Sequence, residues 1–257
     1  MSDLRSLVTI TPVTASSVQM QVAVFNSNIA SVTNGGCCCC WVVPAGVTWA
    51  TFEVWGGGGD GGGACCCSGN FLYGSGSGNY IRKSIQVTAG NYFCTCAASS
   101  GCCSQSQCGT CGFSSWVNCG SNGTSVAYAC GGFMGCVGCF RGYQGCTGIC
   151  YPTCSCGYYS SAASSTFDVQ YPTMQGTAKE SNYCWSIMWN AAAGAPKYGN
   201  NTRIGVEHCT LSLTHMGCSV MNGSKWPGGA GQPASACGGG CCWGGWGAGG
   251  LVLITYG

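Results

Sequence analysis

Glycine runs constrain this chain more than any other feature of its sequence, and the clearest is the GGGGDGGG sequence of residues 56–63. Glycine loses more backbone freedom on folding than any other residue, so an ordered run needs neighbours that satisfy its backbone N–H and C=O groups. Extended glycine segments can adopt the polyproline-II conformation and pack closely side by side. The run therefore belongs either to packed polyglycine segments or to flexible loops. Asp60 within it is interpreted as a turn residue.

The aromatic content favours an ordered chain. Nine Trp, twelve Tyr and eight Phe can each bury roughly 150–250 Å². Several segments alternate apolar with polar residues or are rich in β-branched residues, and no strong 3.6-residue periodicity precedes residue 180, so we expect an all-β fold. The expected strands lie within residues 6–12, 18–25, 41–55, 80–88, 91–97, 124–129 and 251–256.

Charged residues are scarce, at 5% of the chain against an average of about 25%. The net charge of +2 gives little repulsion between copies, so we expect the protein to associate with itself, with a trimer as the first guess. The basic residues are scattered, which predicts no nucleic-acid groove. The first residues lack a secretory leader and no apolar run approaches the roughly 20 residues of a membrane span, so we expect synthesis in a cytoplasm without membrane insertion.

A set of spaced segments resembles the glycine-rich domain of phage tail fibre and adhesin proteins. The matching segments, in order, are VPAGV at 43–47, FEVWGGGG at 52–59, YIRKSIQVTAG at 80–90, GTSVAYACGG at 123–132 and GGLVLITY at 249–256. The resemblance implies a β-sandwich-like scaffold whose first and last strands pair, with long glycine-rich loops at one end. This sequence departs from the family in these loops, because it has cysteine at 65–67 and at 237, 241 and 242 where the family continues in glycine, so its loops are glycine- and cysteine-rich. It also implies a virion protein made in the host cytoplasm.

The resemblance and the composition suggest two regions. Residues 1–36 form an N-terminal β module, which is either a virion attachment module or simply the first part of the sheet. Residues 37–257 form the glycine- and cysteine-rich β domain, with an insertion at about 150–222 that the resemblance does not cover.

Three classes of function are compatible with these features. The first is a non-enzymatic tail fibre or appendage component that contributes to host-surface attachment, with other virion proteins as partners. The second is a capsid-surface decoration protein, which needs the same uncharged interfaces. The third is a secreted cysteine-rich or metal-binding module, which needs an export route.

The 27 cysteines have three interpretations. They are disulfides formed after release from the cell, small apolar side chains in the reduced state, or metal ligands. Because the total is odd, at least one thiol per chain is reduced or bonded between chains. The weak metal candidates are the two C-x2-C pairs Cys108 with Cys111 and Cys136 with Cys139, although such spacings arise by chance at this density.

Catalytic residues are not expected, and neither is a cofactor. The chain has two histidines, His208 and His215, and its acidic residues are widely spread. Cys209 follows His208, but adjacent residues of a strand face opposite sides, so the pair does not form a nucleophile and its base.

Tryptophan on rigid loops gives a large contact area at low entropic cost and stacks on sugars. Trp226, Trp243 and Trp246 are therefore the candidates for contact with a host glycan or protein. The alternative for all three is packing within the core.

Overall fold

The computed structural model describes only part of the chain, and every regular element in that part is a strand. The described residues contain no helix that could cross a membrane. The expectation of an all-β fold is thus confirmed for the described residues. These are residues 21–26, 37–61, 64–65, 71–73, 75–99, 109, 111–120, 122–138, 167–171, 178–180, 227–231, 241–242 and 245–257.

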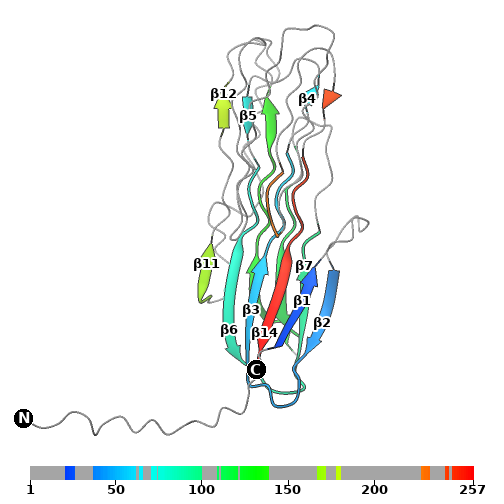
Figure 1. The fold of residues 1–257 in the computed structure, drawn as a ribbon, viewed down its shortest axis with the longest axis vertical. Helices are drawn as coiled ribbons and strands as arrows, with labels where there is room; N and C mark the ends of the chain where they lie inside the picture. The colour runs from blue at the N-terminus through cyan, green and yellow to red at the C-terminus, as the bar shows by residue number, and fades with distance from the viewer. Residues whose placement is uncertain are drawn as a thin grey trace, which may run out of the picture.

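The larger of two main sheets has five antiparallel strands (Figure 1). Their order is β1 (Gln21–Asn26), β14 (Leu251–Tyr256), β3 (Trp49–Trp55), β6 (Tyr80–Gln86) and β11 (Val169–Tyr171). The first and last strands that the structure describes, β1 and β14, are neighbours in this sheet. The last strand therefore lies between two strands from the first quarter of the chain.

The second main sheet has four antiparallel strands. Their order is β2 (Cys37–Val42), β7 (Tyr92–Ala97), β8 (Ser115–Cys119) and β9 (Ser125–Ala129), and the ladder of β8 with β9 shifts register after Val117. β2 and β3 flank a turn formed by residues 44–46 (Pro-Ala-Gly), yet they belong to different sheets. The chain thus passes from one sheet to the other at this turn.

Short strands form two smaller sheets at the far end of the molecule, beyond the main sheets (Figure 1). β5 (Phe71–Tyr73) lies between β10 (Cys136–Gly138) and β12 (Ala178–Glu180). β4 (Ala64–Cys65) pairs with β13 (Cys241–Cys242).

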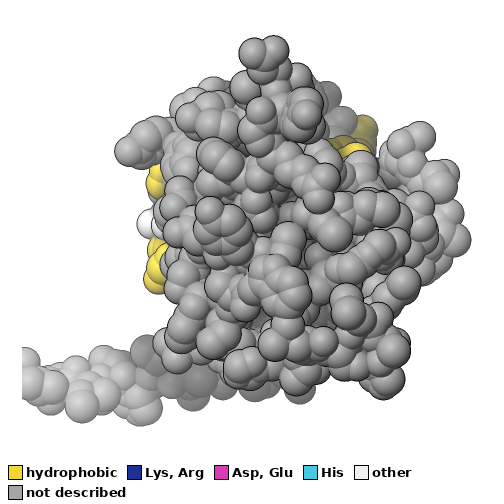
Figure 2. Space-filling view, turned by 90° about the horizontal axis from the view of Figure 1, so that it is seen from above, with side chains coloured by type: hydrophobic (Ala, Val, Ile, Leu, Met, Phe, Trp, Pro, Cys, Tyr) yellow, Lys and Arg dark blue, Asp and Glu magenta, His cyan; other side chains and the backbone are white. Residues whose placement is uncertain are grey.

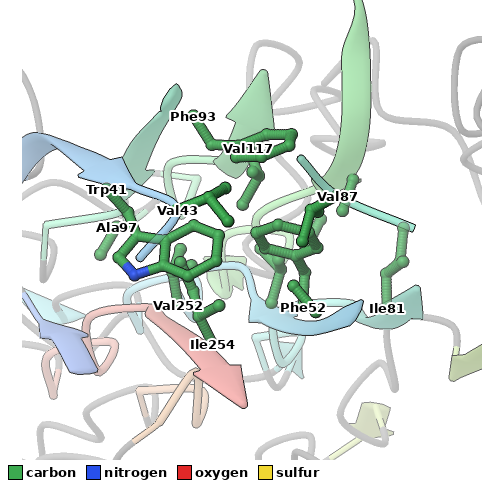
Figure 3. Close-up of a cluster of buried hydrophobic side chains, with 14 residues drawn as sticks. Trp41, Val43, Phe52, Ile81, Val87, Phe93, Ala97, Val117, Val252 and Ile254 are labelled. Carbon is green, nitrogen blue, oxygen red and sulfur yellow. The ribbon is translucent and has the colours of Figure 1, made fainter. Parts of the chain in front are cut away.

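Alternating side chains of both main sheets meet in one hydrophobic cluster (Figure 3). The strand β3 shows why: Ala50, Phe52 and Val54 are buried, whereas Thr51 and Glu53, which alternate with them, are half-buried on the other face. The rings of Trp41 from β2 and Phe52 from β3 pack edge to face, with centroids 6.0 Å apart. The core thus joins the two sheets through aromatic and β-branched side chains.

Glycine permits two tight turns at the end of the molecule near the C-terminus. Gly46 has φ of 83° and Gly90 has φ of 84°, a region that side chains other than glycine rarely adopt. Val47 N donates to Pro44 O across the first turn, at 3.3 Å.

The strand predictions succeed where alternation is clear and fail where cysteine, serine and asparagine obscure it. Strands occur as predicted within 80–88, 91–97, 124–129 and 251–256. The expectation of no other regular strand in 101–157 is wrong, because β8 and β10 lie there. In β8, Ser115 and Val117 are buried while Trp116 and Asn118 are half-buried, so a period of two is present but carried by small and polar residues.

Other predicted regions are described only in part. Residues 6–12, the expected first strand, lie outside the described residues, as do most of residues 150–222. Within 150–222, β11 pairs with β6 and extends the five-stranded sheet, and β12 pairs with β5.

Candidate functional site

Glycine-rich extended segments leave the main sheets together at one end. Trp55 of β3 pairs with Tyr80 of β6 and with Leu251 of β14. The register therefore places Gly56, just after β3, beside the chain entering β6 and β14. Figure 1 shows these segments continuing beyond β3, β6 and β14, away from the C-terminus.

Residues 56–61 form backbone hydrogen bonds that repeat every third residue. Gly56 N donates to Asn79 O at 2.9 Å, and Gly59 N donates to Gly76 O at 3.0 Å. The two donors are three residues apart, and so are the two acceptors. One direction around residues 56–61 is thus filled by an antiparallel neighbour, residues 75–79.

Four further segments surround residues 56–61 in the same way. The bonds are Gly57 N to Phe113 O, Gly58 N to Ala248 O, Gly61 N to Gly245 O, Gly132 N to Gly57 O, Gly135 N to Asp60 O and Gly231 N to Gly59 O, all of 2.7–2.9 Å. Residues 56–61 are therefore the centre of an assembly of six segments. We call this assembly the glycine cluster, and its members are residues 56–61, 75–79, 111–113, 130–135, 227–231 and 245–250.

Steric exclusion of Cβ explains why the cluster uses glycine. A Cβ added at Gly58 would come within 3.0 Å of the Gly229 carbonyl, and one added at Gly132 would come equally close to the Gly76 carbonyl. Real Cβ atoms do not approach backbone so closely, and backbone atoms cannot rotate away as a side chain can. Alanine at either position must push two segments apart.

Asp60 is an acidic residue at the centre of the glycine cluster, and it is fully buried. Its Oδ1 accepts a hydrogen bond from Gly247 N at 2.8 Å, and its backbone carbonyl accepts one from Gly135 N at 2.7 Å. The interpretation of Asp60 as a turn residue is wrong, because Asp60 lies in an extended segment. Its side chain instead joins two segments that are distant in sequence.

Ser115 joins the two main sheets where the glycine cluster begins. Its hydroxyl donates to Trp55 O at 2.6 Å and accepts from Ala98 N at 2.9 Å. Ala98 O in turn accepts from Gly250 N at 2.8 Å. One buried hydroxyl thus links the ends of β3 and β7 next to the start of β14.

Two aromatic side chains of the glycine cluster reach the surface. Trp246 is 54% exposed and Phe113 is 45% exposed. Viewed from this end, hydrophobic side chains show at the margins of the molecule, and no described charged side chain is visible (Figure 2). Of the three tryptophan candidates, Trp246 is thus at the surface, and Trp226 and Trp243 lie outside the described residues.

The metal candidates do not assemble into a site within the described part. Cys111 is disulfide-bonded, so its sulfur is not a thiolate ligand, and Cys136 begins strand β10. Cys108 and Cys139 lie outside the described residues. No group of three or more His, Cys, Asp or Glu side chains is close enough to hold a metal among the residues described.

Cysteines of the described part occur in both redox states. Cys96 and Cys111 are disulfide-bonded. Cys39, Cys40, Cys94, Cys119 and Cys130 are thiols. The disulfide and the reduced interpretations therefore both apply, each to particular residues.

Charged side chains lie on the five-stranded sheet. Glu53 is directly opposite Arg82, and Lys83 Nζ lies 3.6 Å from an oxygen of Asp168. A hydrogen bond from the Ser84 backbone N–H, with a smaller contribution from Lys83, lowers the pKa of Asp168 below its ordinary value. The strands of the four-stranded sheet contain no Asp, Glu, Lys or Arg. The two sheets thus present chemically different outer faces.

Sequence reasoning missed Asp60 and Ser115, because each acts through backbone groups that are distant in the chain. His208 and Cys209, which we do not expect to form a nucleophile and its base, lie outside the described residues. No family model and no curated protein matches the chain.

Proposed function

We propose that the chain is a β-sandwich carrying a polyglycine-II bundle, and that it serves as a non-enzymatic structural component of a phage tail fibre or appendage. The observation that carries the proposal is the three-residue repeat of hydrogen bonds around residues 56–61. The polyproline-II helix has three residues per turn, so the N–H groups of residues i and i+3 point in the same direction. A central segment of this kind can bond to neighbours on all sides.

The sandwich part of the proposal rests on the shared core. Buried side chains of β3, β6 and β14 from one sheet and of β2, β7, β8 and β9 from the other belong to one cluster. Sheets that face each other through such a cluster are held rigidly by close packing. A stiff glycine end on such a body suits a part that projects from a particle.

Assembly from several copies is supported by the surface chemistry. The four strands of the second sheet are uncharged, and Val42 and Tyr92 form an exposed cross-strand pair on them. Uncharged faces with exposed aromatic groups are typical of surfaces covered by another subunit. We propose a homo-oligomer, with a trimer as the starting hypothesis.

We propose that the exposed surface of the glycine cluster attaches to a host surface. Trp246 and Phe113 are exposed there on segments held by backbone hydrogen bonds. Rigid aromatic side chains offer contact area without a large entropy cost, and their faces stack on sugar rings. We infer a glycan or an aromatic-binding protein surface as the ligand class.

Immunogold electron microscopy tests the proposal most simply. Antibodies raised against the purified chain are applied to intact particles purified from the source. Gold at fibres or appendages supports the proposal, and gold spread over the capsid supports a decoration protein instead. Recovery of the protein only in the particle-free fraction would overturn both.

A further inference from the structure

A second feature, outside the glycine cluster, is a pair of thiols on the four-stranded sheet. Cys40 lies directly opposite Cys94 in the ladder of β2 with β7. Their sulfur atoms are 3.4 Å apart and share a hydrogen bond. Cys40 is exposed and Cys94 is half-buried, so small reagents can reach the pair from solvent.

The backbone geometry at this pair suits a disulfide. Val43 N donates to Asn91 O at 2.8 Å, which marks those opposite residues as a hydrogen-bonded pair. Hydrogen-bonded and non-hydrogen-bonded pairs alternate along an antiparallel ladder, so Cys40 and Cys94, three positions on, form a non-hydrogen-bonded pair. Cα atoms of such pairs are about 4.5 Å apart, inside the range of roughly 4.4–6.8 Å that disulfides require.

The location of the pair gives a disulfide a structural effect. β2 is the edge strand of its sheet, and β7 is its neighbour within the sheet. Edge strands lack a partner on one side and are where local opening begins most readily. A covalent bond between positions 54 residues apart in sequence would hold this edge in place and reduce the freedom of the unfolded chain.

We propose that Cys40 and Cys94 are an oxidation site, at which a low-molecular-weight disulfide of the oxidised glutathione class closes a cross-strand bond that fixes β2 to β7. In the first step the Cys40 thiolate attacks one sulfur of oxidised glutathione, and one glutathione thiolate leaves. In the second step Cys94 loses its proton to solvent and attacks the Cys40 sulfur, and the second glutathione leaves. Two protein thiols are oxidised to one disulfide, and one glutathione disulfide is reduced to two thiols.

Cys40 is the first nucleophile because it is the more exposed of the two. Hydrogen bonding to Cys40 is the main reason that the pKa of the Cys94 thiol is raised above its ordinary value. Because Cys94 holds its proton more tightly than an ordinary thiol, we assign it the role of the resolving thiol, which attacks second. The reaction is expected to speed up with rising pH as thiolate forms.

Cys39 provides a matched control. It is an exposed thiol like Cys40, but it lies opposite Thr95 and points to the other face of the strand. Cys39→Ser therefore removes a neighbouring thiol without touching the proposed bond. Serine is close in size to cysteine, and circular dichroism verifies that each variant keeps its β structure.

The experiment treats the purified full-length chain with oxidised glutathione, blocks remaining thiols with N-ethylmaleimide and maps cross-links by peptide mass spectrometry. We expect a Cys40–Cys94 cross-link, lighter by about 2 Da than the two thiol peptides, in the natural sequence and in Cys39→Ser. In Cys94→Ser the expected product is a glutathione adduct trapped at Cys40. Alkylation of both residues after oxidation, or a cross-link of Cys40 to another cysteine, would overturn the proposal.

Discussion

At the scale of single residues, the structure depends on hydrogen bonds to backbone N–H and C=O groups at positions where only glycine fits. Residues 56–61 have neighbours on every side, and most of their partners are backbone atoms. Asp60 is the position at which a side chain supplies one of these bonds. Its side chain is therefore important for stability, because it accepts a buried backbone hydrogen bond.

Replacement of Asp60 tests this role. Asp60→Ala leaves Gly247 N–H buried without its acceptor, so we expect the free energy of unfolding to fall by about 1–3 kcal/mol. Asp60→Asn retains a side-chain oxygen and should lose less. Urea unfolding measures both, with Asp168→Ala as the control.

Asp168 is a suitable control because it is an aspartate with hydrogen-bond and ion-pair partners, but is largely exposed. Water screens its interactions, so its loss should cost at most about 1 kcal/mol. A loss at Asp168 as large as that at Asp60 would contradict the structural role given to Asp60.

Trp246 tests the proposed attachment surface. Trp246→Ala should reduce adsorption of assembled particles to host cells at least about fivefold while leaving assembly intact, because loss of an aromatic anchor residue costs more than about 1 kcal/mol. Trp49→Ala is the matched control. Trp49 is 52% exposed, close to the 54% of Trp246, but begins β3 at the opposite end of that strand from the glycine cluster.

If the Trp246 and Trp49 variants lose adsorption equally, the surface of the glycine cluster is not the specific contact with the host. Loss of assembly in Trp246→Ala would instead assign that side chain to packing between subunits.

At the scale of elements, the two main sheets and the glycine cluster are joined at a few defined points. Ser115 is the clearest, because one hydroxyl bonds to the end of β3 and to the residue after β7. The same region carries the hydrogen bond from Gly250 to Ala98. Order in the glycine cluster should therefore be coupled to order in the sheets.

Ser115→Ala tests that coupling. The substitution leaves the Trp55 carbonyl and the Ala98 N–H without this partner, and we expect a loss of about 1–3 kcal/mol in the free energy of unfolding. Ser84→Ala is the control, since Ser84 Oγ makes a half-buried bond to Thr51 Oγ1 at 3.0 Å within one sheet. Thermal unfolding compares the two variants, and equal effects would contradict a special role at the junction.

The sequence predicts strands better than it predicts how segments meet. Alternation in residues 80–88 and 251–256 reports burial of one face directly, so these strands were predictable. The strand β8 was not predicted, because Ser115 is buried through its hydrogen bonds and not through hydrophobicity. The partners of residues 56–61 were not predictable, because glycine has no side chain to indicate which distant segment it contacts.

The tryptophan candidates show the same limit. Trp246 could be identified as a tryptophan in a glycine-rich segment, but its exposure depends on how residues 245–250 pack against residues 56–61. Phe113 is exposed in the same cluster and has no distinguishing sequence signal.

At the scale of the whole molecule, the low charge of the chain and the uncharged strands of the four-stranded sheet favour association between copies. We expect sedimentation equilibrium of the purified chain to give a defined oligomer, with a trimer of the 26.1 kDa subunit as the hypothesis. Because β2, β7, β8 and β9 contain no charged residue, an interface on that sheet should be insensitive to salt. A monomer at all concentrations, or dissociation by salt, would contradict this interface.

The hydrogen bonds of residues 56–61 predict that the glycine segments form one rigid body with the sheets. Hydrogen–deuterium exchange tests it most directly at the donor amides of Gly56, Gly57, Gly58, Gly59 and Gly61. After correction for intrinsic rates, these amides should exchange as slowly as those of β3, with exposed Gly46 as a fast reference. Exchange of residues 56–61 at the rate of an unstructured glycine peptide would show that these segments are not held against the sheets.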